Sequence, residues 1–97
     1  MNNDIFNALA DPTRRKIIAM ISRSPMTPTE VAAKFPMSRQ AISRHLQLLS
    51  RCGVLTVRID GREYLYNLRP EALAQVDHWL DPIRQRWSAR FAPPDKH

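Results

Sequence analysis

The chain has 97 residues, enough for one domain with a single modest core, and 43% of them are hydrophobic. Its single cysteine excludes an intramolecular disulfide framework, and no apolar run approaches the ~20 residues that a membrane span needs. The formal net charge of +6 favours a polyanionic partner, most often nucleic acid and less often an anionic membrane. Because no signal peptide is recognisable, we expect a cytoplasmic protein.

Two helices are expected in the first quarter of the chain. Asp4 is a candidate N-cap for a short helix through Ala10. Asp11 followed by Pro12 is a stronger start signal, because aspartate caps a helix and proline fits its first position. The second helix is expected from Pro12 to Ser22, with one stripe of isoleucines facing the core.

A helix-turn-helix arrangement is predicted next. Thr27 is a candidate N-cap, Pro28 fits the first helical position, and Glu30 can complete a capping box. We expect a helix of about eight residues that Pro36 ends, and then a three-residue turn. A longer helix should follow over residues 38–53, in the position of a helix that reads the major groove.

This longer helix, Ser38 to Gly53, is amphipathic. Ile42, Leu46 and Leu49 recur at helical spacing and predict a buried stripe. The opposite face carries Arg39, Gln40, Ser43, Arg44, Gln47 and Arg51. With no acid among them, these side chains suit phosphates and base edges. A solvated surface helix is the alternative, and the neighbouring elements favour the reading helix.

After Gly53 the spacing of the apolar residues changes from the helical period of 3.6 residues to an alternation of every second residue. This change predicts a β-hairpin. Two β-rich runs, residues 54–59 and 62–68, are joined by Asp60-Gly61, a strong hairpin signal. The pairs expected from a two-residue loop are Ile59 with Arg62, Arg58 with Glu63, Val57 with Tyr64, and Leu55 with Tyr66. This register places aliphatic and tyrosine side chains on one face and an opposite-charge pair on the other.

The hairpin tip is expected to be basic. It carries Arg58 and Arg62 beside Gly61. A two-stranded ribbon after a helix-turn-helix is a wing, which can reach the DNA backbone or the minor groove. A hairpin that only covers the core is the alternative, and the two arginines favour phosphate contact.

A final helix is expected over residues 70–91. Its apolar residues recur at spacings of 3 and 4, as in a heptad seam, and Trp79 and Phe91 widen the stripe. The apolar surface of this helix is larger than a small domain is expected to bury at its terminus. We therefore expect the helix to form a homodimer interface. The alternative is a helix that covers the core of a monomer. The expected interface residues are Leu73, Val76, Trp79, Leu80, Ile83 and Trp87. Residues 1–92 should then form one domain, with residues 93–97 as a frayed tail.

Taken together, several sequence segments resemble those of the ArsR family of small bacterial winged helix-turn-helix repressors. They are ALADPTRRKII (residues 8–18), TEVAAKF (29–35), MSRQAISRHLQLLSRCGVL (37–55) and DGREYLYNL (60–68). Residues 77–87 are more similar to the metal-independent, SdpR-like autorepressors than to the metal sensors. The resemblance implies a mainly α fold with a β-hairpin wing, in the order α-α-α-α-β-β-α. It also implies a homodimer formed by the terminal helices, which blocks transcription by binding double-stranded DNA at an operator.

The resemblance also implies which residues contact DNA. By position, Ser38, Arg39, Gln40, Ser43 and Arg44 match the DNA-reading residues of the family, and Arg58 and Arg62 match its wing. Two reader helices would then occupy successive major grooves of an inverted repeat, about 34 Å apart.

The chain departs from the sensors of the family. Metal-sensing relatives carry a Cys-x-Cys pair in the helix occupied here by residues 29–35, which contain no cysteine. His78 stands beside Asp77 without the His-x-x-Glu partner that other sensors carry on this helix, and a zinc site would need Asp77, His78 and Asp81 to supply ligands across a dimer. Thiol-sensing relatives use two cysteines, whereas this chain has only Cys52. We therefore expect no metal and no cofactor, with a metal- or thiol-responsive regulator as the alternative.

Two other classes of function are less well supported. A winged helix used as a protein-interaction module is disfavoured, because proteins seldom present a basic, acid-free face to one another. An enzyme is not expected, because the chain has no cleft pattern of paired carboxylates, no glycine-rich phosphate loop and no Cys-His nucleophile pair.

Overall fold

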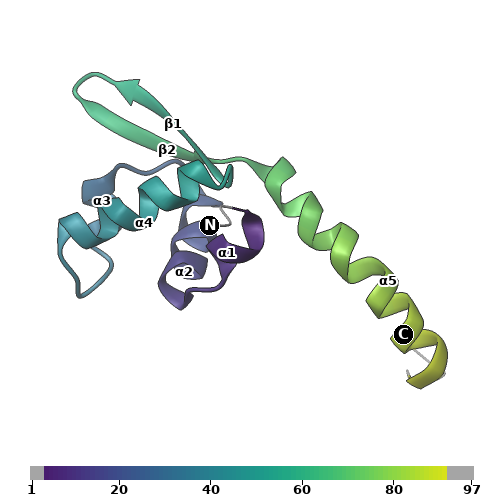
Figure 1. Ribbon diagram of the computed structural model, residues 1–97. Helices are drawn as coiled ribbons and strands as arrows, with labels where there is room; N and C mark the ends of the chain where they lie inside the picture. Colours follow the sequence, from purple (N-terminus) through teal and green to yellow (C-terminus); the bar gives the residue numbers. More distant parts are fainter. Residues whose placement is uncertain (1–3, 92–97) are drawn as a thin grey trace.

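The computed structural model describes residues 4–91 and has the expected mainly α fold with a β-hairpin wing (Figure 1). Its elements are α1 (Ile5–Leu9), α2 (Pro12–Ile21), α3 (Pro28–Ala32), α4 (Arg39–Arg51), β1 (Leu55–Asp60), β2 (Glu63–Leu68), the 3-10 turn η1 (Pro70–Leu73) and α5 (Ala74–Phe91). The tail expected at residues 93–97 lies outside the described residues. Within residues 4–91, no helix combines the length and hydropathy that a membrane span requires.

The first four helices begin at the residues that the sequence predicts. The capping oxygens belong to Asp4, Asp11, Thr27 and Ser38, and each accepts a hydrogen bond from the amide three residues further on. At α3 the capping box is complete, because the Thr27 amide also donates to Glu30 Oε1 at 2.9 Å. These short local contacts fix where each helix starts.

The end of α4 is equally well defined. Gly53 adopts a φ of 79°, and the amides of Gly53 and Val54 donate to the carbonyls of Ser50 and Leu49. This pair of bonds is a Schellman motif, which needs a left-handed residue and therefore favours glycine. It turns the chain out of α4 and directly into β1.

Arg14 joins α1 to α2. Its Nε and Nη2 atoms donate to the carbonyls of Ala8 and Asn7, each at 3.0 Å. These carbonyls lie at the C-terminal end of α1, where they lack helical partners and where a positive charge is favourable. Arg14 is thus a structural residue of the α1–α2 corner.

The helix α3 is shorter than the eight residues predicted, and the connection to α4 is correspondingly longer. It ends at Ala32, and the amides of Lys34 and Phe35 bond to carbonyls three residues back. Pro36 has no amide to donate to the carbonyl of Ala32 and disfavours α geometry at Phe35, so no further α-helical turn follows these 3-10-type bonds. Phe35 is half-buried against the core from this irregular segment.

The core draws on every element except α5. Its buried residues are Ile5, Ala8, Ile17, Ile18, Ile21, Val31, Ile42, Leu46, Leu49, Val54, Leu55, Tyr66 and Ala72. The three α4 members are fully buried. The predicted stripe of α4 is therefore its core side, which leaves the opposite face to solvent. The base of the hairpin is held by two backbone bonds between Tyr66 and Met26, at 2.9 and 3.1 Å.

The hairpin register differs from the predicted one by two residues. The observed pairs are Leu55 with Leu68, Val57 with Tyr66, Arg58 with Leu65, Ile59 with Tyr64, and Asp60 with Glu63. Gly61, with a φ of 67°, takes the first central position of the loop, so the loop is Gly61-Arg62 and not Asp60-Gly61. The predicted Arg58–Glu63 pairing is therefore wrong. Because the shift is even, the aliphatic and tyrosine side chains still share one face.

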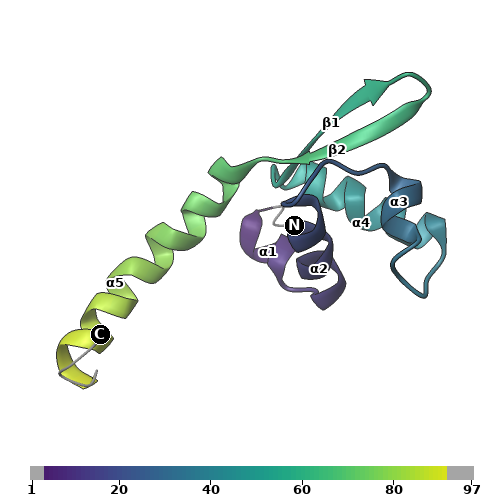
Figure 2. The same ribbon diagram turned by 180° about the vertical axis from the view of Figure 1, so that it is seen from behind.

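The last helix starts later than predicted and leaves the body of the domain. Pro70–Leu73 forms the 3-10 turn η1, and α5 then projects away as a single rod (Figures 1 and 2). Val76 packs partly on the core, whereas every residue from 81 to 90 is exposed. Trp79 makes an edge-to-face contact with Phe6 of α1, with ring centroids 5.8 Å apart.

Candidate nucleic-acid interface

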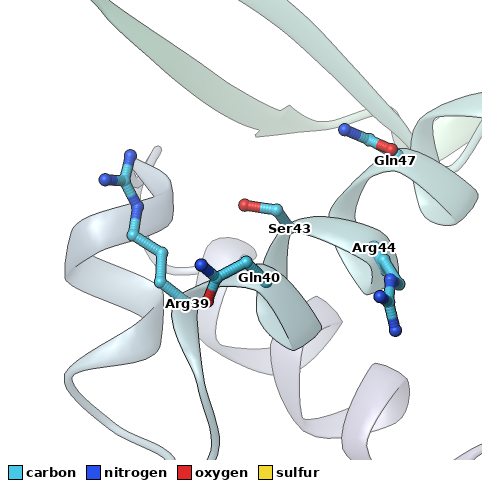
Figure 3. Close-up of a pocket in the computed structure, with 5 residues that line it drawn as sticks. All are labelled: Arg39, Gln40, Ser43, Arg44 and Gln47. Atoms are coloured by element: carbon cyan, nitrogen blue, oxygen red, sulfur yellow. The ribbon is translucent and has the colours of Figure 1, made fainter.

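The outer face of α4 forms one shallow polar surface (Figure 3). The residues that line it are Arg39, Gln40, Ser43, Arg44 and Gln47. They face outward because the buried stripe of α4 lies on the other side of the helix. The structure thus brings together four of the five α4-region residues singled out from the sequence.

Gln47 also lies on this surface, on the helix face where the sequence placed it, although it was not among the residues matched to DNA contact. It stands four residues after Ser43 and three after Arg44, so helical spacing alone places it on the same face. Ser38, by contrast, was a predicted site residue but does not line this surface. Its hydroxyl accepts the Ala41 amide at 3.1 Å, so this side chain is committed to capping α4 and does not line the surface.

The two arginines of the surface point in different directions. Figure 3 shows Arg39 and Arg44 extending to opposite sides, with Gln40 and Ser43 between them. Within the part of the chain that the structure describes, neither guanidinium forms an ion pair or donates a hydrogen bond. Since α4 contains no acid, its outer face carries an uncompensated positive charge.

The wing arginines have different surroundings. Arg62, in the hairpin loop, lines a small cavity of about 150 Å³ together with Arg39 and with Thr29 of α3. Arg58 is paired with Leu65, and its side chain lies on the hairpin face opposite the one that carries Val57 and Tyr66. The structure therefore brings Arg62 to the reader helix and leaves Arg58 on the outer side of the wing.

A second groove separates the C-terminal half of α4 from the inner hairpin face. It is lined by Gln47, Ser50, Arg51, Val57, Tyr64 and Tyr66. Burial raises the pKa of the Tyr66 phenol above its ordinary value. The groove continues from the polar surface of α4 towards the wing, with a mainly apolar lining and no acidic group.

The residues considered for metal or thiol chemistry are scattered. Cys52 is half-buried, and burial raises the pKa of its thiol, which disfavours the reactive thiolate. Asp77 and His78 lie exposed on α5. Among residues 4–91, no three His, Cys, Asp or Glu side chains are grouped so that they could hold a metal ion.

A helix-turn-helix followed by a hairpin, with a basic reader face, defines a winged helix-turn-helix DNA-binding protein. A family model described as a helix-turn-helix domain matches residues 9–58. The transcriptional repressor SdpR of Bacillus subtilis is 33% identical over 80% of this chain and 87% of its own length. The HTH-type transcriptional regulator Rv2034 of Mycobacterium tuberculosis is 37% identical, covering 90% and 81%.

Solved structures agree with these matches. The crystal structure of an ArsR family transcriptional regulator covers 89% of both chains with a TM-score of 0.79 and 34% identity. Repressors named for mercury and arsenical resistance also match. The chain belongs to the ArsR family of winged helix-turn-helix repressors. It is a DNA-binding transcriptional regulator and not an enzyme.

Proposed function

We propose that this chain is a homodimeric repressor that binds an inverted-repeat operator and needs no metal ion to do so. The observation that carries the proposal is the exposed, acid-free face of α4, where Arg39 and Arg44 have no partner among the described residues. Unpaired guanidiniums on a helix of this kind suit phosphates and the acceptor edge of guanine.

The side chains of this face divide by chemistry. Arg44 can donate two parallel bonds to guanine, and Gln40 can pair with the donor and acceptor of adenine. Ser43 and Gln47 offer shorter polar contacts to bases or phosphates. Ser38 caps the helix, so its contact to DNA is limited to the backbone next to the α4 N-terminus. Arg58, on the outer face of the wing, reaches only phosphate or the adjacent minor groove.

The dimer is supported by the exposed apolar side chains of α5. Trp79 is 57% exposed, Ile83 38% and Trp87 62%, on a helix that projects from the domain. An apolar stripe of this kind marks an interaction surface, and a second copy covers it with self-complementary geometry. The proposed interface residues are Leu73, Val76, Trp79, Leu80, Ile83 and Trp87. Leu73 and Val76 are shared between this interface and the core.

Footprinting on the promoter of its own gene tests the function directly. We expect protection of two half-sites with centres one helical turn apart. With ~6–10 phosphate contacts per dimer, affinity for this site should fall by about 10³–10⁵ between 50 and 200 mM salt. An absent footprint, together with salt-independent binding to a protein partner, would support the interaction-module alternative.

Metal independence is tested by removing metal. We expect the affinity for the protected fragment to be the same after exhaustive chelation and after addition of zinc, because no ligand group of three is present among residues 4–91. Fluorescence anisotropy with labelled duplex gives the affinity in each state. A change of tenfold or more on adding zinc would instead place this chain with its metal-responsive relatives.

A further inference from the structure

We propose that Arg39 and Arg62 form a shared clamp for one phosphate of the DNA backbone, at the junction of α3, α4 and the wing. The inference rests on the proposed operator binding and divides the arginines of the site by role. Arg39 and Arg62 hold a phosphate, whereas Arg44 is left to read a base.

The first step is the convergence of two positive groups. Arg39 begins α4 and Arg62 lies in the hairpin loop, yet both line the same cavity of about 150 Å³. Within residues 4–91 neither guanidinium has a hydrogen-bond or ion-pair partner. Two like charges that line one space repel each other, and the one carboxylate on the same lining, that of Glu63, offsets only one of them, so a net positive charge remains for an anion to neutralise.

The second step is the chemistry of the remaining lining. Thr29 and Tyr64 contribute hydroxyl groups, which can donate to phosphate oxygens in addition to the two guanidiniums. Glu63 also lines the cavity, and its carboxylate opposes an anion there. Such a small space with four donors suits a compact anionic group and is too small for a base pair.

The third step is the position of the cavity relative to the reader face. Arg39 lines both the polar surface of α4 and this cavity, so the two are contiguous. Figure 3 shows that its guanidinium points away from Arg44. When α4 lies in the major groove, a group held by Arg39 and Arg62 therefore lies at the edge of the groove, where the backbone runs. The occupant is accordingly a phosphodiester of the bound duplex.

The test is a double-mutant cycle on DNA affinity. Arg39→Ala and Arg62→Ala should each weaken binding about tenfold, equally for the footprinted fragment and a random 30-base-pair duplex, and each should lower the salt slope by about one. Because both side chains hold the same phosphate, the double variant should lose well under the product of the two single losses. Arg58→Ala is the matched control, since it removes the same charge from the other hairpin face. Its loss should multiply with that of Arg39→Ala.

A backbone scan locates the phosphate itself. Duplexes with a single neutral methylphosphonate at successive positions should show one position per half-site that weakens the wild type and leaves the double variant unaffected. Glu63→Gln should strengthen binding at low salt. If the losses of Arg39→Ala and Arg62→Ala multiply, or if Arg39→Ala alters the preference at one base pair, the shared clamp is wrong. Neither result contradicts the proposed operator binding. That proposal is contradicted only if the wild-type protein leaves no footprint.

Discussion

Replacing Ile83 by aspartate should convert the proposed dimer into folded monomers and reduce operator affinity by at least a hundredfold. Ile83 lies on the exposed part of α5, where it shares an apolar patch with Trp87. Arg86 and Arg90 border this patch, so a carboxylate there can gain an ion pair, but covering it in a dimer still costs the desolvation of a charge at an apolar contact. A monomer can occupy only one half-site, so it also loses the gain from binding two linked sites.

Sedimentation equilibrium gives the mass, and thermal unfolding reports whether the domain survives. We expect the core to be retained, because residues 81–90 make no part of it. Gln85→Asp is the matched control, since it places the same charge two residues further along, on the other side of α5. It should remain dimeric. An Ile83→Asp variant that keeps the mass of a dimer would remove α5 from the interface.

The second large effect is expected at Arg44. Arg44→Ala should weaken operator binding by ~1–3 kcal/mol per contact and abolish the preference at one base pair of each half-site. The reason is geometric, because Arg44 lies on the outer face of α4 with no partner among the described residues. Its guanidinium is therefore free to donate two parallel bonds to a guanine edge.

Arg44→Lys separates reading from charge. Lysine keeps the positive charge and loses the planar fork, so the salt slope should be retained while the base preference weakens. Binding selections on randomised half-sites measure that preference for each variant. An equal loss on all sequences would assign Arg44 to a phosphate, and an unchanged isotherm would exclude it from the interface.

The local features of this fold could be predicted because they depend on residues close together in the chain. A cap needs one side-chain oxygen and an amide three residues away, and Asp4, Asp11, Thr27 and Ser38 all meet that condition. The buried stripe of α4 follows in the same way from helical spacing, because Ile42, Leu46 and Leu49 recur on one side.

The prediction was wrong where a short motif allowed two arrangements. Asp60-Gly61 can form the loop itself, or glycine can open a loop that starts one residue later. The observed backbone takes the second arrangement, with Gly61 at positive φ. The base of the hairpin is also tied to Met26, a contact across 40 residues that no local pattern reveals. Similarly, α3 ends at Ala32, whereas the restriction that Pro36 imposes predicts an end only at Phe35, so the earlier end was not predicted.

By itself, the sequence determined the element order, the starts of the first four helices and the basic outer face of α4, since each depends on spacing within one segment. Only the tertiary structure decided which of these residues meet. It places Arg62 beside Arg39 and Arg58 on the far side of the wing, because the hairpin folds back over α4 in a register that differs by two residues from the predicted one. It also divides the apolar seam of the last helix, since Val76 reaches the core whereas Ile83 projects into solvent. Contacts of this kind depend on packing between segments that are distant in the chain, and the hydrophobic periodicity of a single segment does not predict them.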